Sequence, residues 1–443
     1  MTVAEDEADA QVEEPNVLDP VRQFFALERD VLVLSLAMFA FSLGFQMTNR
    51  FLPEYLVVLG ATGFVVGLYA TLGNVIGAIF PYYGGAVSDR VGSRLALTIF
   101  GLLSTVGFGI WLAGAFVPPV DLGVVVLEPW IWVFVGLLFA QCWKSFGIGA
   151  TYAIVKQSVP PDRLARGFAS TETFRRSAFL LAPLIVAVLI ADDLLPGFLY
   201  VLAIAVFFGA VGTLVQHVHY EPEDTVGTEF QGMSQIFADV RTMPEPLKPL
   251  LVADTLVRFA NGMVYVFFIL VITQVMGIGL SLSLPVVGTV DLSPAALFAL
   301  LLAVEMTVAL LTMAPVAKLA EYTGLKPVVG FGFSVYAIFP VLLIFAPEHA
   351  GVLLVLFAFS GLRFAGLPAH KALVVGPAER GAGGRVTGSY YFLRNLLVIP
   401  SGALGGLLWE FASPEVSFVV ASAIGLVGVV YFALFGTEFE AYA

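Results

Sequence analysis

The chain has 443 residues, of which 59% are hydrophobic and only 12% are charged, and its formal net charge at pH 7 is −12. Soluble domains carry roughly a quarter of charged residues, so this composition excludes an ordinary soluble protein and favours one that lies in a lipid bilayer. The single cysteine, Cys142, excludes a disulfide framework. Residues 4–14 are acidic rather than basic, so we expect no signal peptide.

Twelve apolar stretches follow one another along the chain, and each is long enough to cross a membrane. A helix rises 1.5 Å per residue, so about 20 apolar residues span the hydrocarbon core. We therefore predict an all-α integral membrane protein with twelve transmembrane helices. The predicted spans are residues 31–54, 63–84, 95–116, 129–155, 167–190, 196–216, 249–275, 293–317, 327–346, 350–376, 386–410 and 414–436.

Basic residues fall on alternate connections between the predicted spans. Arg90 and Arg94 lie in the 2–3 connection, for example, whereas the connections on the other side carry Asp or Glu and no Lys or Arg. Basic loops stay in the cytoplasm, so this asymmetry predicts the orientation. We expect three cytoplasmic segments in a plasma-membrane protein. They are an acidic tail over residues 1–30, a linker over 217–248 and a short tail over 437–443.

The acidic excess does not by itself indicate a cationic partner. Most of it lies in the N-terminal tail and in the stretch from Glu221 to Glu229, and charge runs of this kind are typical of solvated segments. We expect no nucleic-acid partner. His217 and His219 stand without a Cys or a third His nearby, which makes a poor metal site, so we expect neither a metal nor a cofactor.

A charged turn between the second and third spans has a second copy in the other half of the chain. The first copy contains Gly85, Asp89, Arg90, Gly92 and Arg94. The second keeps the spacing with Ala317, Glu321, Tyr322, Gly324 and Lys326. This pattern resembles the signature turn of the major facilitator superfamily, which joins the second and third helices of each half.

An internal repeat extends beyond this turn. Gly60 matches Gly277 at an offset of 217 residues, and Arg163 matches Arg380 at the same offset. The repeat predicts two pseudo-symmetric six-helix halves, residues 31–216 and 249–436. The resemblance implies a secondary transporter that works by alternating access, with its site near the bilayer midplane.

The resemblance also implies a gating role for the turn. The small residue at 85 or 317 allows close helix packing, and Gly92 and Gly324 permit a tight reversal. In the family the turn acid faces the start of the eleventh helix, here near Arg385, and holds the cytoplasmic side closed. By the same relation Glu321 would face the start of the fifth helix near Arg166. The gating residues are therefore expected to be Gly85, Asp89, Arg90, Gly92, Arg94, Glu321, Gly324 and Lys326.

Four cations lie inside the first, fourth, seventh and tenth spans, the helices that line the central cavity in this family. They are Arg50, Lys144, Arg258 and Arg363. Burying charge in a membrane is costly, so such residues usually face a cavity or a partner. We expect Lys144 and Arg363 on opposite walls of one site. Arg50 has an alternative, since its long side chain could reach the outer headgroups.

The acids inside the spans have competing roles. Asp254 lies one turn before Arg258, close enough for an ion pair. Glu305 is either a proton-coupling residue or the counter-ion of Arg258 or Arg363. Further from the centre, we expect an ion-pair network of Arg175, Arg176 and Arg394 with Glu172 or with the turn acids.

Three functions remain open at this point. The first is transport of a small organic or inorganic anion through a cationic cavity; the second is proton-coupled export of amphipathic compounds with Glu305 as carrier. The third is a transporter-like receptor or a membrane enzyme, although no span or loop clusters catalytic residues, so we expect no enzyme. No ATP-binding loop is present in the sequence, so the energy would come from a gradient, with a proton or sodium as coupling ion. We expect a monomer in the bilayer.

Overall fold

The structure, a computed structural model, describes residues 29–121, 123, 126–158, 164–220, 243–284, 288–376 and 383–438. Long helices dominate the first part of the chain. They are α2 (Arg29–Asn49), α3 (Leu52–Val58), α4 (Gly63–Val91), α5 (Ser93–Gly114), α6 (Ile131–Ser158), α7 (Leu164–Leu189) and α8 (Leu194–His219). Strands β1 (Val120–Asp121) and β2 (Val126–Leu127) form an antiparallel pair between α5 and α6.

The second part of the chain contains more interruptions. Its first membrane-length segment consists of α10 (Leu247–Val264), the 3-10 turn η2 (Tyr265–Phe267), α11 (Phe268–Leu270) and the π-helix η3 (Val271–Met276). An antiparallel hairpin of β3 (Leu280–Leu284) and β4 (Gly288–Leu292), not predicted from the sequence, follows. The remaining elements are α12 (Pro294–Thr323), α13 (Leu325–Ile344), α14 (Ala350–Gly361), the 3-10 turn η4 (Leu362–Phe364), α15 (Leu367–Val375), α16 (Gly383–Val398), α17 (Ser401–Phe411) and α18 (Pro414–Phe435).

Ten helical stretches in the described part of the chain are long and apolar enough to cross a membrane. Two predicted spans are not among them. In α6 the apolar stretch Ile131–Phe146 is shorter, and α7 carries four charged residues within its length. The structure therefore supports a multi-pass helical membrane protein, while the count of twelve spans stays a prediction.

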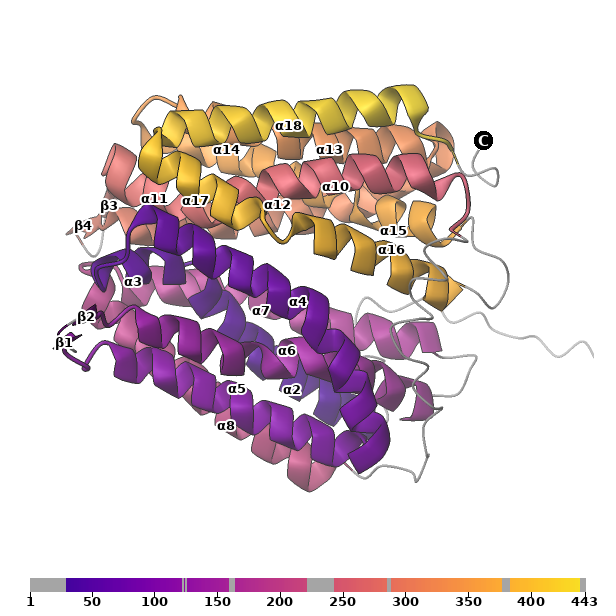
Figure 1. The fold of residues 1–443 in the computed structure, drawn as a ribbon, viewed down its shortest axis with the longest axis horizontal. Coiled ribbons are helices and arrows are strands. Elements are labelled where there is room, and N and C mark those ends of the chain that lie inside the picture. The colour runs from indigo at the N-terminus through magenta and orange to yellow at the C-terminus, as the bar shows by residue number, and fades with distance from the viewer. Residues whose placement is uncertain are drawn as a thin grey trace, which may run out of the picture.

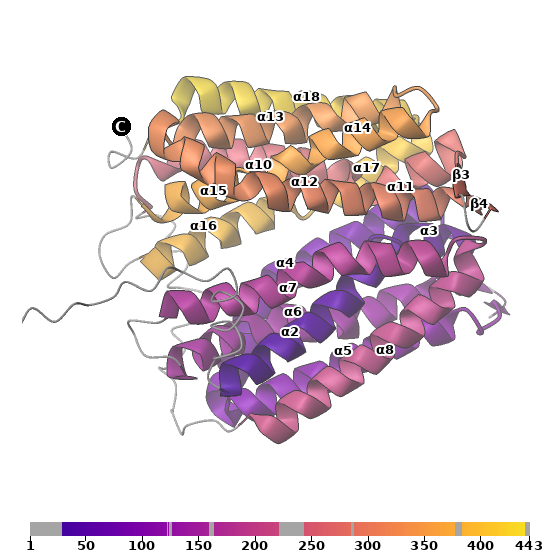
Figure 2. The same cartoon turned by 180° about the vertical axis from the view of Figure 1, so that it is seen from behind.

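The helices lie in two groups. Helices α2 to α8 pack together and form the first group, and α10 to α18 form the second (Figure 1). Both hairpins lie at one end of the molecule, which we call the hairpin end. The start of α2 and the end of α18 lie at the opposite end, the terminal end (Figures 1 and 2). Most of the predicted linker and of both predicted tails falls outside the described residues, so the domain boundaries stay a prediction.

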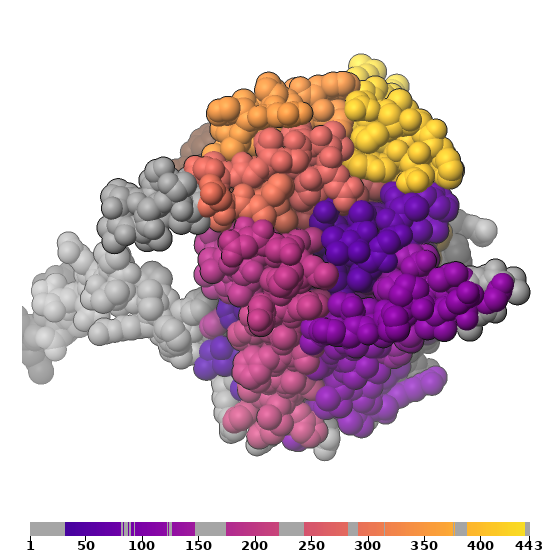
Figure 3. Space-filling view, turned by 90° about the vertical axis from the view of Figure 1, so that its left-hand side faces the viewer, coloured from indigo at the N-terminus to yellow at the C-terminus, as the bar shows by residue number. Residues whose placement is uncertain are grey.

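The two groups meet closely at the hairpin end. A Cβ on Gly67 of α4 would lie 2.4 Å from the carbonyl oxygen of Gly402 in α17, so only glycine allows this approach. Further along α4, a Cβ on Gly73 or Gly77 would have no neighbour within 4 Å. The space-filling view of the hairpin end shows the two groups in contact across their boundary (Figure 3). The groups therefore touch at this end and separate toward the terminal end.

Prolines explain three of the helix breaks. Proline lacks the N–H that would bond to the carbonyl four residues earlier, and it also clashes with that carbonyl. Pro53 follows the break between α2 and α3, Pro368 follows η4, and Pro400 separates α16 from α17. Irregular backbone at membrane depth is tolerated where it is buried in protein or lines a cavity. The breaks at Arg50 and after Val398 border the central cavity, whereas η4, which contains Arg363, is buried in protein.

Candidate functional site

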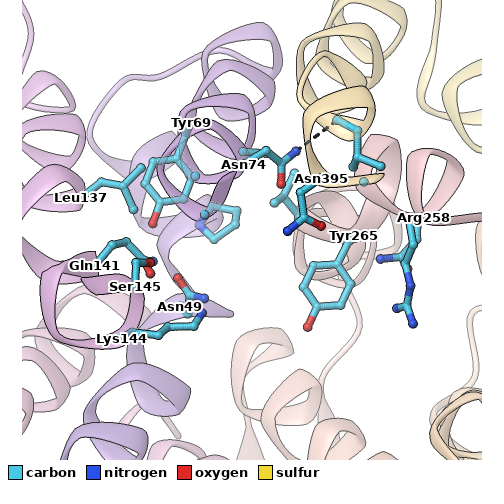
Figure 4. Close-up of a pocket in the computed structure, with 18 of the residues that line it drawn as sticks. Asn49, Tyr69, Asn74, Leu137, Gln141, Lys144, Ser145, Arg258, Tyr265 and Asn395 are labelled. Atoms are coloured by element: carbon cyan, nitrogen blue, oxygen red, sulfur yellow. Dashed lines mark hydrogen bonds between the residues drawn. The ribbon is translucent and has the colours of Figure 1, made fainter. Parts of the chain in front are cut away.

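A cavity of about 460 Å³ lies between the two groups. Figure 4 shows side chains from both groups pointing into it. The lining residues are Asn49, Arg50, Pro53, Tyr69, Ala70, Gly73, Asn74, Gly77, Leu137, Gln141, Lys144, Ser145, Arg258, Asn261, Gly262, Tyr265, Val266, Arg394, Asn395 and Val398.

The lining mixes polar and apolar residues, and its charged groups are all positive. Arg50, Lys144, Arg258 and Arg394 contribute cations, and none of the described lining residues is Asp or Glu. Five amide side chains, from Asn49, Asn74, Gln141, Asn261 and Asn395, add hydrogen-bond donors and acceptors. A solute in this cavity would meet a positive field strengthened by the low-dielectric surroundings.

Helix α6 supplies one wall through a single face. Gln141, Lys144 and Ser145 fall within one helical turn and point toward the cavity (Figure 4). Lys144 is exposed, and its ammonium lies 5.8 Å from the centre of the Phe45 ring. It forms no hydrogen bond or ion pair with any residue the structure describes. Lys144 is therefore the cation of this wall that is free to meet a solute.

The opposite wall carries two arginines that share one carboxylate. Arg258 Nε donates to Asp254 Oδ1 at 3.3 Å, and Arg394 Nη1 donates to Asp254 Oδ2 at 3.0 Å. Asp254 itself is fully buried. It therefore orients both guanidinium groups, while further donors of Arg258 and Arg394 bond to Tyr336 and Asn395 respectively. The predicted Asp254–Arg258 pair is present.

Asp254 has two further partners that the sequence analysis missed. The Tyr390 hydroxyl donates to Asp254 Oδ2 at 3.1 Å, and His370 Nε2 lies 3.2 Å from the same oxygen. Tyr390 precedes Arg394 by one helical turn, so their shared face could have been noticed. His370 comes from α15, and no spacing in the sequence relates it to α10.

Glu305 of α12 forms a second buried network. It pairs with Arg363, and its other oxygen lies 3.9 Å from Arg50. Aromatic rings enclose both arginines. The Arg50 guanidinium lies 4.0 Å from the Tyr265 ring centre, and that of Arg363 lies 4.8 Å from the Phe364 ring. Glu305 thus pairs with Arg363, one of the two expected counter-ion partners, and its role in proton coupling stays a prediction.

Three expectations about the arginines differ from this conformation. Arg363 does not line the cavity opposite Lys144; it is 2% exposed and lies behind Tyr265, because η4 turns it toward Glu305. Arg394 was expected to pair with Glu172 or the turn acids. It lines the cavity and pairs with Asp254. Arg50 does not extend to the outer headgroups, since its side chain is 10% exposed and is held by Glu305 and Tyr265.

The two copies of the charged turn have the predicted backbone. Gly92 and Gly324 adopt φ of 83° and 89°, conformations that favour glycine. Arg94 donates to the carbonyl of His217 at the end of α8. Arg90 is exposed, and Lys326 contributes its backbone N–H to Glu438.

The expected contacts of the turn acids stay a prediction, because the side chains of Asp89, Arg166 and Arg385 lie outside what the structure describes. Glu321 is exposed and has no hydrogen bond or ion pair within the described residues. Instead, the Glu438 carboxylate accepts from the N–H groups of Leu325 and Lys326 at the start of α13. The side chain of Glu172 and the surroundings of Gly85 also lie outside the described part of the chain. Arg175 lies against the Phe179 ring, at 5.5 Å from its centre.

Solved structures of transporters resemble the fold at low sequence identity. A mutant of the nucleoside transporter NupG matches with a TM-score of 0.71 and 12% identity, covering 92% of this chain and 99% of that one. A POT family transporter in complex with 5-aminolevulinic acid matches with 0.70 and 12%, covering 93% and 99%. The peptide transporter POT in complex with sulfate matches with 0.67 and 16%, covering 94% and 97%.

Sequence comparison gives the family. No curated protein is similar enough in sequence to be matched. The sequence model described as Major Facilitator Superfamily matches residues 34–290, more than half of the chain. The apolar helices, the paired charged turns and the cavity between two helix groups agree with that match, and the chain belongs to the major facilitator superfamily of transporters.

Proposed function

We propose that the chain is a secondary transporter of the plasma membrane that moves a small anion by alternating access. Its two halves would be six-helix units related by the internal repeat, with twelve membrane spans in all. The distribution of Lys and Arg assigns the terminal end to the cytoplasm. With the hairpin end closed and Gly73 and Gly77 beside open space, the cavity would then face the cytoplasm in this conformation.

The uncompensated positive charge around the cavity carries the proposal of an anionic substrate. Arg258 and Arg394 share Asp254, Arg50 and Arg363 share Glu305, and Lys144 has no carboxylate partner within the described residues. Unpaired cations in a membrane interior are costly, at roughly 2.5–3.5 kcal/mol each on the lower scale. An anion held between Lys144 and the two cavity arginines would offset that cost.

The second candidate is proton-coupled export of amphipathic compounds, with Glu305 as the proton carrier. Two observations favour the anion. Glu305 lies between Arg50 and Arg363, so its carboxylate is already engaged as their counter-ion. The cavity also carries four cations and five amides and no described acid, whereas pockets for amphipathic compounds have only a few polar groups.

The test is transport by the purified protein in liposomes. A panel of small carboxylates, phosphates and sulfate would be compared with a panel of cationic and neutral drugs, under imposed proton or sodium gradients. We expect uptake of at least one anion, and we expect Lys144→Gln to raise its KM at least tenfold. Lys248→Gln is the matched control, because Lys248 pairs with Glu245 on the exposed surface away from the cavity.

The outcomes separate the two candidates. Anion uptake that is unaffected by Lys144→Gln and by Arg394→Gln would overturn the anionic site. Drug efflux that loses its proton dependence in Glu305→Gln would establish the exporter in its place.

A further inference from the structure

Glu54 is a buried acid at the boundary between the two helix groups. It lies in α3 at the hairpin end and is 8% exposed. Its Oε2 lies 2.6 Å from Thr273 Oγ1, and both of its oxygens lie 3.3 Å from Gln274 Nε2. Thr273 and Gln274 belong to η3 of the second group, so these contacts join the groups where the molecule is closed.

The Thr273 hydroxyl has two acceptors within hydrogen-bond distance but can supply a proton to only one of them. Thr273 Oγ1 also lies 3.0 Å from the carbonyl oxygen of Ile269, but a hydroxyl has only one proton to donate. If that proton goes to Ile269, the short contact with Glu54 requires a proton on Oε2. If it goes to an ionised Glu54, the contact with the carbonyl is left without a proton. Only the protonated acid satisfies all three oxygens at once.

The surroundings of Glu54 also favour its neutral form. The other two buried acids of the described residues, Asp254 and Glu305, pair with arginines, whereas Glu54 forms no ion pair there. Burial without a cation disfavours a carboxylate. The Gln274 amide and the first turn of the seven-residue α3 offer only partial compensation.

The elements packed against α3 bring no counter-charge to Glu54. Arg50, one turn earlier, is engaged with Glu305 and Tyr265. Tyr55 donates to the carbonyl of Trp111, and Tyr69 of α4 packs on a phenylalanine ring. Helix α11 has no titratable side chain, and α8 carries its histidines at the far end, His217 and His219.

We propose that Glu54 is the binding site of the coupling proton and that its protonation holds the hairpin end closed. The proton forms the Oε2–H bond and is donated to Thr273, which leaves the hydroxyl proton for Ile269. When it dissociates, the single hydroxyl proton of Thr273 can serve either Glu54 or the carbonyl of Ile269 but not both, so one of the two hydrogen bonds is lost and the two groups separate at this end. The proton then leaves to the solvent that the opening admits. An anion and a proton moved together would transfer less net charge than the anion alone.

The experiment follows the opening of the hairpin end as a function of pH and needs no substrate. Spin labels are placed by Val58→Cys in α3 and Val275→Cys in η3, both exposed positions, in a Cys142→Ser background of the full chain in nanodiscs. Distances between the labels are measured from about pH 5 to about pH 9, the range into which burial can move a carboxylic acid. We expect one short distance at low pH and a growing longer component as the pH rises.

Variants assign this response to Glu54. Glu54→Gln supplies an uncharged side chain whose amide can donate to Thr273, so we expect it to stay closed at every pH. Thr273→Val removes the acceptor of the Glu54 proton, which weakens the closed form. The midpoint of the pH-dependent opening should therefore shift to lower pH. Glu410→Gln is the matched control, because Glu410 also joins the groups at this end, by accepting from Gly63 N–H at 2.9 Å, but is exposed. Its pH response should equal that of the parent.

Several results would overturn the proposal. They are a parent without a pH response, a Glu54→Gln variant with the parental response, or a Glu410→Gln variant that loses the response. A Thr273→Val midpoint identical to that of the parent would remove the role of the hydroxyl. Since no substrate is present, these results do not bear on the anion proposal.

Discussion

Two carboxylates, Asp254 and Glu305, each serve two arginines, but their surroundings differ. Asp254 holds Arg258 and Arg394 at the cavity surface, where solvent or a solute can reach them. Glu305 is 1% exposed, and Arg363 beside it is 2% exposed. Loss of Asp254 would therefore affect the cavity itself, whereas loss of Glu305 would leave a charge without a partner in the protein interior.

This difference predicts a large loss of stability for Glu305→Gln. Breaking a buried pair from one side leaves an uncompensated charge, which costs roughly 3–5 kcal/mol. Unfolding of the purified protein in mixed micelles would measure the loss. The double variant Glu305→Gln with Arg363→Met removes both charges and should recover most of it. A double variant as unstable as the single one would contradict this explanation.

At the scale of helices, glycine determines where the two groups come together. Helices α4 and α17 approach through Gly63, Gly67, Gly402 and Gly406, and the same α4 passes Gly73 and Gly77 beside open space. Small residues allow such contacts between membrane helices. Helix α4 therefore contains both a close contact with α17, at Gly67, and part of the cavity wall, at Gly73, less than two turns away.

Gly67→Ala and Gly73→Ala form a matched pair that tests this arrangement. A Cβ at 67 would overlap the backbone of α17, and overpacking of this kind costs roughly 1–3 kcal/mol, so the closed hairpin end should be disfavoured. A Cβ at 73 would meet nothing within 4 Å and should have no effect. The spin labels at positions 58 and 275 measure the fraction of molecules that show the longer distance. Equal fractions in the two variants would refute the contact.

The elements could be predicted largely from the sequence, and their interruptions only in part. Apolar runs of membrane length gave the position of the helices, since hydropathy is a local property. The breaks at Pro53, Pro368 and Pro400 have a local cause and could have been predicted. The β3–β4 hairpin was not predicted, since it lies in the connection between the predicted spans 249–275 and 293–317, to which no element was assigned.

The contacts of the site could be predicted only where both residues lie on one helix, at a separation that brings their side chains together. The Asp254–Arg258 pair follows from a separation of four residues. The place of Arg363 behind Tyr265 depends on the turn η4, and the contact of Glu54 with Thr273 joins residues 219 positions apart. Neither has a local signal, because both depend on how separate helices come together.

At the scale of the whole molecule, the contacts that close the hairpin end indicate what must change when the transporter passes from one state of its cycle to the other. The hairpin end is held by Glu54, by Glu410 and by the packing of Phe51 on Phe298, whose ring centres are 5.8 Å apart. Opening this end would break these contacts, so closure at the terminal end must supply replacements. The charged turns lie at that end, as the family resemblance requires for gating.

The orientation of this closed end can be tested directly. If basic loops mark the cytoplasm, the hairpin end faces outward. Single cysteines at Asp121, Asp193 and Glu348, all exposed, should react with an impermeant maleimide added to intact cells in a Cys142→Ser background. Cysteines at Ser93, Thr225 and Thr323 should react only after the cells are permeabilised. Labelling of Thr323→Cys in intact cells would place the terminal end outside, and the cavity of this conformation would then open away from the cytoplasm.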